Sequence, residues 1–225
     1  MITDPFDSGP TGTFKTLCQT YPDDTVYRGA DGFRSLWGPI FYRGRANGTA
    51  RLLAIGQDPA QTEAVTRRIL SGQAGRRVQG FVEKLGYTKS YLMINAFVYG
   101  IYNQNMALPH LNDREIQAYR QKWLEAAFAP GKIEAVVTFG TPAFDAWTTF
   151  KATPVGQTVT AFHHRALHPT AQARSEGAAQ CQAAHEAGRD QAAGPDRVAQ
   201  QQAGLPEPQR LEKQRGAARG EKGEA

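Results

Sequence analysis

The sequence contains few cysteines and lacks any long apolar run. The chain has 225 residues but only two cysteines, Cys18 and Cys181, which are too few and too far apart for a disulfide framework or a CxxC metal site. This scarcity favours a reducing, cytoplasmic setting. No apolar stretch reaches the roughly 18 residues that a membrane-spanning helix needs, so no membrane span is expected. Residues 1–10 carry two acidic residues and no basic residue, unlike a signal peptide.

The motifs of several common enzyme classes are also missing. The sequence has no G-x-x-x-x-G-K-[ST] and no G-x-G-x-x-G, which argues against a Walker-type NTPase and a dinucleotide-binding enzyme. It has no G-x-S-x-G elbow of the kind that carries a nucleophilic serine. His163 and His164 are adjacent on an expected strand and should point to opposite faces, which argues against a shared metal ion.

Aromatic residues are absent from the last part of the chain. All 22 of them precede residue 171, and the 55 residues that follow contain only three large apolar side chains, Val198, Leu205 and Leu211. Burial of so little apolar surface cannot offset the conformational entropy that the chain would lose on folding. Residues 171–225 are therefore expected to be a disordered Ala/Gln/Gly/Arg tail or at most a fraying helix. The tail has eight basic and eight acidic residues, so the net charge of +5 belongs to residues 1–170.

Short apolar runs alternate with helical patterns between residues 51 and 170. Strands are expected at residues 51–55, 91–97, 135–139 and 159–167. Helices are expected at residues 14–20 and 62–70, around Val78 to Leu85, after Asn112 or Asp113, and from Thr141 as N-cap. The alternation predicts a three-layer α/β/α domain with a central, mainly parallel, four-stranded sheet over residues 51–170. Residues 1–50 are expected to form an irregular lead-in packed on this domain.

The four expected strands end at residues that can do chemistry. In open parallel sheets the binding site lies beyond the carboxyl ends of the strands. These ends carry Gly56-Gln57-Asp58-Pro59, Asn95, Gly140-Thr141 and His168-Pro169. We therefore expect an Asp, an Asn and a His to meet at one edge of the sheet.

Each of these three residues has both a functional and a structural interpretation. Pro59 holds Asp58 in an extended conformation that can aim its carboxylate, but Asp58 can equally cap a helix beginning near residues 60–62. The Asn95 amide can read the edge of a nucleobase or can belong to a strand-end turn. A neutral His168 can stabilise a developing oxyanion or can be a hydrogen-bonded structural histidine. Gly56 is expected to permit a sharp exit from the first strand.

Three segments in order resemble the motifs of the uracil-DNA glycosylase superfamily. They are LLAIGQDPA (52–60), YLMINAF (91–97) and ALHPT (166–170). The GQDP core is identical to the opening of motif one in the first uracil-DNA glycosylase family, and the third segment resembles that family's HPS motif. Residues 136–147, VVTFGTPAFDAW, resemble the strand and helix that the superfamily places between motifs two and three.

The resemblance implies a DNA repair N-glycosylase that starts base excision. Such a hydrolase flips uracil out of DNA and breaks its glycosidic bond, leaving an abasic site. By motif, Asp58 would position or activate the water and stabilise the cationic sugar, and His168 would stabilise the charge on uracil O2. Asn95 would hydrogen-bond the uracil edge, and the Gln57 backbone would line the pocket. The implied partner is uracil-containing DNA, with no metal or cofactor, and we expect a monomer.

The remaining candidate site residues surround these motifs. Gly56, Ala60 and Leu70 complete the set expected to bind substrate. A basic domain suits DNA, because phosphate contacts supply most of the non-specific affinity. The residues expected to contact DNA are Arg67, Arg68, Arg76, Arg77, Pro169 and Thr170. The alternative for the four arginines is a solvated helix face.

The sequence departs from the superfamily at several positions. Ala60-Gln61 replaces the Tyr-His that follows GQDP in the first family, and Leu70 in LSGQAG (70–75) stands where a base-stacking Phe is usual. The four cysteines of the iron–sulfur members are absent, so no cluster is expected. Residues 171–174 offer no apolar wedge after HPT, and we hypothesise that the coding frame changes near residue 171.

Two other functions fit the same residues. The chain can be a non-catalytic or covalently trapping uracil-DNA binder of the same fold. It can also be an α/β enzyme that acts on free nucleosides or nucleotides.

Overall fold

A computed structural model of the protein describes residues 7–22, 26–27 and 32–169. The chain divides into two compact units, and all of these residues belong to the first, residues 1–177. The tail expected after residue 170, the hypothesised change of frame and Thr170 itself lie outside the described residues, and the domain boundaries at residues 50 and 170 stay predictions. Within the described residues no helix is both long and apolar enough to cross a membrane.

A mixed sheet of five strands forms the centre of this unit. The strand order is β1-β3-β2-β4-β5, where β1 is Tyr42–Gly44, β2 is Leu52–Gly56, β3 is Tyr91–Asn95, β4 is Ala135–Phe139 and β5 is Phe162–Ala166. Strands β3, β2, β4 and β5 run parallel, and β1 pairs antiparallel with β3. The predicted α/β class and parallel sheet are confirmed. The predicted count of four strands misses β1, which is only three residues long and carries Arg43 between Tyr42 and Gly44.

The inner strands form because their side chains are apolar on both faces. Every residue of β2 and of β3 is buried, which is typical of a parallel strand covered on both sides. The edge strand β5 differs, because most of its residues are exposed and Phe162 is 70% exposed.

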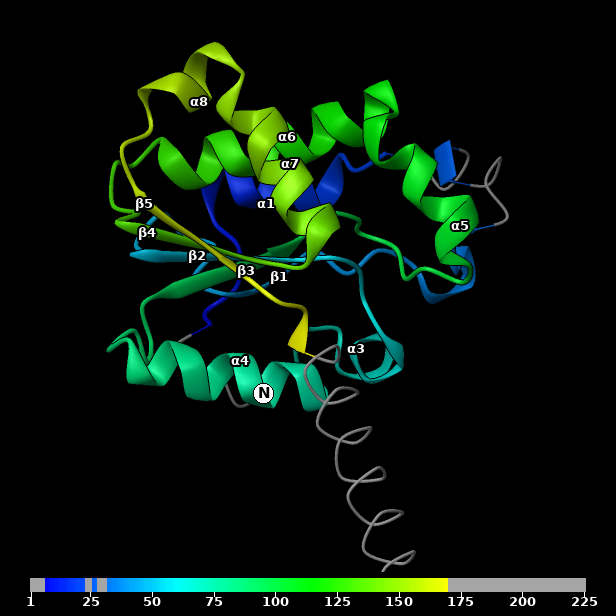
Figure 1. The fold of residues 1–225 in the computed structure, drawn as a ribbon, viewed down its shortest axis with the longest axis horizontal. Helices are drawn as coiled ribbons and strands as arrows, with labels where there is room; N and C mark the ends of the chain where they lie inside the picture. The colour runs from blue at the N-terminus through cyan, green and yellow to red at the C-terminus, as the bar shows by residue number, and fades with distance from the viewer. Residues whose placement is uncertain (1–6, 23–25, 28–31, 170–225) are drawn as a thin grey trace, which may run out of the picture. The chain divides into compact units, whose positions relative to one another are not determined.

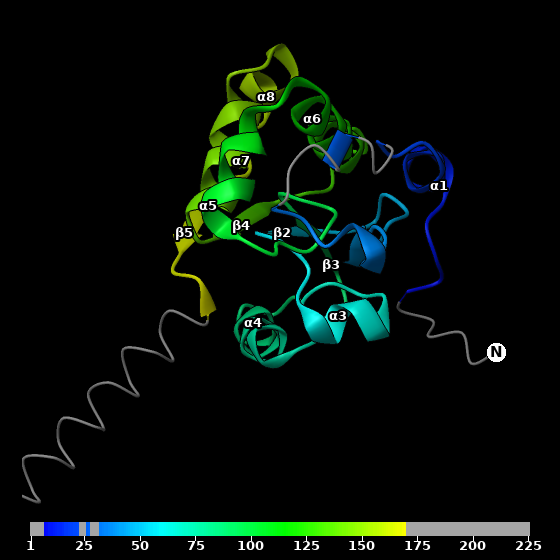
Figure 2. The ribbon, with the colours of Figure 1, turned by 90° about the vertical axis from the view of Figure 1, so that its right-hand side faces the viewer.

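Helices cover both faces of the sheet (Figure 1 and Figure 2). On one face lie α1 (Gly12–Gln19), α6 (Arg114–Phe128) and α7 (Thr141–Lys151), and on the other lie α3 (Gln61–Thr66) and α4 (Gln73–Lys84). The short elements are η1 (Ser35–Trp37), α5 (Gln104–Ala107), η2 (Leu108–Asn112) and α8 (Pro154–Thr158). A separate cluster of buried apolar side chains fills each side of the sheet, so the three-layer arrangement is confirmed.

Two helices begin or end at residues other than those expected. The N-cap of α7 is Gly140, with φ of 85°, and Thr141 is the first helical residue rather than the cap. Helix α3 ends at Thr66 instead of continuing to residue 70, because Arg67 takes a left-handed conformation with φ of 56°.

The buried carboxylate of Glu63 fixes the turn between α3 and α4. Its Oε2 accepts the N–H of Ala60 at 3.0 Å, and its Oε1 accepts the N–H groups of Ser71 and Gly72 at 3.0 and 3.2 Å. Glu63 is only 5% exposed, so these three donors satisfy a group that would be costly to bury alone. A Glu three residues after an N-cap is a local signal for such a role.

Replacing Glu63 with alanine should destabilise the protein markedly. Three backbone N–H groups lose their acceptor, and we expect the free energy of unfolding to fall by roughly 3 kcal/mol. Urea unfolding of the full chain measures this value. The control is Glu83→Ala, which removes an exposed carboxylate from α4 and should change stability by less than about 0.5 kcal/mol. Equal effects of the two substitutions would contradict the role given to Glu63.

Candidate functional site

The carboxyl ends of four neighbouring strands carry the expected site residues. Gly56 and Asn95 are paired in the register of β2 and β3. Gly140 directly follows β4, and His168 follows β5 by two residues. Because β3, β2, β4 and β5 are adjacent and parallel, the structure brings the Asp, Asn and His segments to one edge of the sheet, as expected.

Asp58 is tied to the segment that follows β3. Its Oδ2 accepts the backbone N–H of Ile101 at 2.9 Å. Asp58 does not cap α3, because Ala60 is the N-cap residue and Glu63 accepts the Ala60 N–H. The alternative interpretation of Asp58 as a helix cap is therefore wrong.

The surroundings of Asp58 disfavour its charge. Burial raises the pKa of the Asp58 carboxyl to about 6, and the nearby Glu63 carboxylate adds to the rise. The Ile101 N–H and the Arg34 guanidinium oppose the increase in pKa without cancelling it. The carboxylate is therefore mainly ionised at neutral pH but remains poised to take a proton, which is typical of groups in active sites.

The Asn95 amide occupies space that a side chain at position 56 would fill. The Asn95 side chain is buried, with 7% of the residue exposed. A Cβ added to Gly56 would lie 2.4 Å from Asn95 Oδ1, closer than van der Waals contact allows. Gly56 leaves the space that this amide occupies. Its φ is not positive, and the chain bends at Gln57 directly after it, so the expected contribution of Gly56 to a sharp exit from the strand stays a prediction.

His168 packs against the turn that opens α7. A Cβ added to Gly140 would lie 3.3 Å from His168 Cβ, so the absence of a side chain at Gly140 permits this approach. Burial lowers the pKa of the half-buried His168 imidazole. The ring is therefore neutral at neutral pH. A neutral imidazole still has one N–H, which can donate a hydrogen bond to a developing anion.

Arg34 is a further site residue, and the sequence alone did not indicate it. Its Nε donates to the Ile101 carbonyl at 3.3 Å, on the same residue whose N–H binds Asp58. Its guanidinium carbon lies 4.7 Å from the centre of the Trp37 ring and 4.9 Å from that of Tyr102. The sequence feature that could have indicated Arg34 is its place between two aromatic residues in the segment FRSLW (33–37).

The four arginines expected to contact phosphate differ in their surroundings. Arg67 donates to the carbonyls of Trp37 and Pro39, and Arg68 forms an ion pair with Asp7 at 2.9 Å. Arg77 donates to the carbonyl of the buried Pro169 at 2.9 Å, across 92 residues of sequence. Three of the four thus have structural partners, although contact with DNA stays a prediction for all of them.

Arg76 differs from the other three arginines. Its side chain is exposed, and no hydrogen bond or ion pair links it to another of the described residues.

The other expected substrate-binding residues lie around α3. Ala60 is exposed at the start of this helix, and Gln57 is half-buried just after β2. Leu70 has a φ of 51° and packs partly on the core beneath the sheet, on the side of α4. Its carbonyl accepts Arg43 Nη1 at 2.7 Å, which holds this left-handed residue in place.

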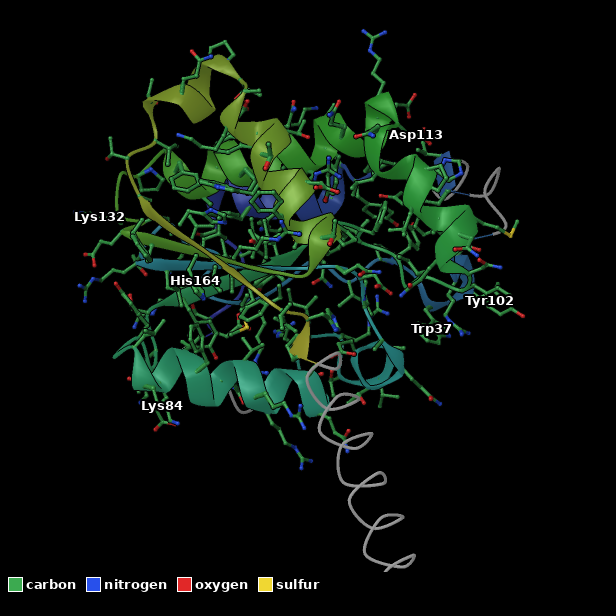
Figure 3. The ribbon with its side chains drawn as sticks, viewed as in Figure 1. Trp37, Lys84, Tyr102, Asp113, Lys132 and His164 are labelled. Atoms are coloured by element: carbon green, nitrogen blue, oxygen red, sulfur yellow. The ribbon has the colours of Figure 1, made fainter. Side chains whose placement is uncertain are left out.

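His163 and His164 do point to opposite faces of β5. His163 Nε2 lies 3.1 Å from Thr138 Oγ1, on the side of α7. The ring of His164, which is labelled in Figure 3, stacks instead on that of Phe81 in α4. Across residues 7–22, 26–27 and 32–169, no group of three or more His, Cys, Asp and Glu side chains could hold a metal ion.

The segments that carry Asp58, Asn95 and His168 thus follow the carboxyl ends of three strands in the parallel part of the sheet. The family model described as Uracil DNA glycosylase superfamily matches residues 43–190, well over half of the chain. The chain belongs to the uracil DNA glycosylase superfamily, and a DNA glycosylase-like function follows from this membership. The matched range is wider at both ends than the motif segments, which span Leu52 to Thr170. No curated protein matches the chain.

The raised pKa of Asp58 should make its charge a cost to stability. The folded protein holds this proton more tightly than the unfolded chain, whose carboxyl has a pKa near 3.8, so stability falls as the pH rises from about 4 to about 6. Asp58→Asn removes the titration. We expect the stability of this variant relative to the original chain to rise by roughly 3 kcal/mol between pH 4 and pH 8.

Urea unfolding at both pH values measures the effect. Asp145→Asn, which removes an exposed carboxylate from α7, is the control for a general charge effect. A stability difference between Asp58→Asn and the original chain that is independent of pH would show that Asp58 titrates alike in the folded and unfolded states.

Proposed function

We propose that the protein hydrolyses the bond between uracil and deoxyribose in DNA. The observation that carries this proposal is the partly buried Asp58 carboxylate, held by the Ile101 N–H at the same strand-end edge as Asn95 and His168. Membership of the superfamily supports the reaction class. The choice of uracil as the base is part of the proposal.

The chemistry follows from the charges of the three groups. In the flipped nucleotide, the glycosidic C–N bond breaks and its electron pair leaves with the base, so the sugar becomes cationic and the base anionic. The anionic Asp58 stabilises the cationic sugar and orients the water that adds to it. The neutral His168 donates an N–H to the base oxygen where negative charge grows. The water bonds to the sugar carbon and gives up a proton, the uracil anion takes up a proton, and the products are neutral uracil and an abasic site.

Asn95 provides recognition of the base. Its amide offers one donor and one acceptor side by side, and uracil presents an N–H and a carbonyl in the same arrangement. Because Asn95 is buried beside Gly56, its amide is confined to few orientations. A confined amide discriminates between bases better than a mobile one, because the wrong base leaves a buried polar group unpaired.

Activity should rise with pH through the ionisation of Asp58. Its pKa of about 6 places the half-maximal kcat/KM on the acidic limb near pH 6, with a tenfold fall per pH unit below that value. Burial lowers the pKa of His168, which favours its neutral imidazole at neutral pH. The measurement is cleavage of an oligonucleotide containing one uracil between pH 4.5 and pH 8.5. A flat profile over this range would contradict the assignment.

Asp58→Asn should abolish most of the turnover while retaining the bound complex. We expect kcat to fall about 100-fold or more, because the variant can neither stabilise the cation nor orient the water as a carboxylate does. Alkali treatment after incubation cuts the DNA at each abasic site and so counts product. Asp145→Asn is the control and should cleave like the original chain.

The same assay separates the alternatives. Uracil-DNA that is shifted on a gel but remains uncut would indicate a binder, and a complex that survives denaturation would indicate covalent trapping. Base release from free nucleosides but not from DNA would indicate the nucleoside enzyme. Substrates with U:A, U:G, single-stranded uracil and T:G then test how thymine is excluded when Ala60 replaces the usual tyrosine.

A further inference from the structure

A small cavity lies between helix α6 and the end of strand β3. Its lining includes Ile116, Tyr119, Arg120 and Trp123 of α6, together with Ile94 and Asn95 of β3. The four α6 residues are spaced i, i+3, i+4 and i+7, so they belong to one face of the helix. The amide expected to recognise the base and this face of α6 therefore border the same space.

The guanidinium of Arg120 is buried but only partly satisfied. Arg120 is 4% exposed, and its Nη2 donates to the Leu111 carbonyl at 3.1 Å. Its buried Nη1 has no hydrogen-bond partner among the described residues, and none of the ion pairs among them includes Arg120. Burial lowers the pKa of this guanidinium to about 10, so it is still charged at neutral pH. Because a buried charged donor without an acceptor is costly, Nη1 calls for an acceptor inside the cavity.

The cavity has room for one water molecule. The centre of a water molecule can move within about 10 Å³, which is close to the smallest space that holds one water and too small for a larger ligand. A water is stable in such a space when it has at least two polar partners. Arg120 Nη1 is one such partner, and the Asn95 amide is a second on the wall formed by β3.

Packing alone does not determine which way the Asn95 amide faces. No hydrogen bond links its side chain to another of the described residues. The oxygen and the nitrogen of an amide are nearly equal in size, so the space beside Gly56 suits either of them. The two orientations differ for a base, since uracil needs an acceptor opposite its N–H and a donor opposite its carbonyl. A hydrogen bond from within the protein is therefore needed to select one orientation.

We propose that Arg120 is a positioning residue that sets the orientation of the Asn95 amide through one water molecule in this cavity. The water accepts a hydrogen bond from Arg120 Nη1 and donates one to Asn95 Oδ1. Since an amide oxygen has two lone pairs, Oδ1 can also accept the N–H of uracil, which leaves Nδ2 to donate to the uracil carbonyl. This inference rests on the proposed function, because it concerns how the edge of uracil is recognised.

Arg120→Met tests this role through binding instead of turnover. It removes the guanidinium but keeps a long side chain. One duplex carries 2′-fluoro-deoxyuridine, which keeps the base and resists cleavage, and the other carries a tetrahydrofuran abasic site, which has no base. We expect the affinity for the uracil duplex to fall about tenfold and that for the abasic duplex to change less than about twofold, because Asn95 contacts only the base. A general loss of structure would instead weaken both complexes.

Two further variants control for charge and for folding. Arg114→Met makes the same substitution at an exposed position of α6 and should leave the ratio of the two affinities unchanged. Urea unfolding shows whether each variant retains the fold. If Arg120→Met does not fold, Arg120→Lys gives the same measurement. The lysine keeps the charge but lacks the fork that reaches both the Leu111 carbonyl and the water, so the affinity ratio should fall about threefold.

A double-mutant cycle tests whether Arg120 acts through Asn95. In a chain that already carries Asn95→Ala, Arg120→Met should change the affinity ratio by less than about twofold, because the amide that it orients is gone. Additive losses from the two substitutions would overturn the inference, and so would an unchanged ratio in the folded Arg120 variant.

The outcomes separate this inference from the proposed function. Uracil release by the original chain, combined with additive losses, would overturn the role of Arg120 and leave the glycosylase standing. Absence of abasic product, combined with a coupled loss of base recognition, would overturn the hydrolysis and leave the role of Arg120 standing. Equal affinity of the original chain for the uracil and abasic duplexes would overturn the inference, and the cleavage assay would still decide the hydrolysis.

Discussion

The hydrogen bond from the Ile101 N–H to the Asp58 carboxylate is the contact on which the site depends. It joins the segment after β2 to the segment after β3, and Arg34 adds a bond to the same residue through the Ile101 carbonyl. The bond offsets only part of the cost of burying the carboxylate, since the Asp58 pKa remains at about 6. The ionised Asp58 carboxylate is therefore energetically unfavourable in its buried position, and the rest of the fold holds it there. A nearby positive charge would lower the energy of the ionised form.

Glycines at the strand ends give the other two site residues their places. Gly56 leaves the space that Asn95 Oδ1 occupies, and Gly140 leaves the space against which His168 packs. In both cases a glycine at the end of the neighbouring strand leaves room that a side chain would fill. A side chain at position 56 would meet the Asn95 amide oxygen, and one at position 140, where φ is 85°, would meet the His168 side chain.

Much of the fold, and the positions of Asp58, Asn95 and His168 after the strand ends, could be predicted from local patterns. Strands β2 and β3 are continuous apolar runs, and the residues after them follow directly from where those runs end. The edge strand β1 could not be found this way, because its three residues are specified by pairing with β3 and not by a pattern of their own. Arg34 was missed for the same reason, since its contact with Ile101 spans 67 residues of sequence.

The arginines show how one charge can have two functions. A positive domain is expected for a protein that binds DNA, but Arg67 uses both terminal nitrogens to hold the carbonyls of Trp37 and Pro39. Arg77 holds the Pro169 carbonyl, next to His168. A guanidinium has more donors than either contact uses, so these residues can keep the protein's shape and still approach a phosphate. A phosphate bound by Arg67 or Arg77 would then be positioned relative to η1 or to the His168 segment by the same side chain that holds that part of the chain.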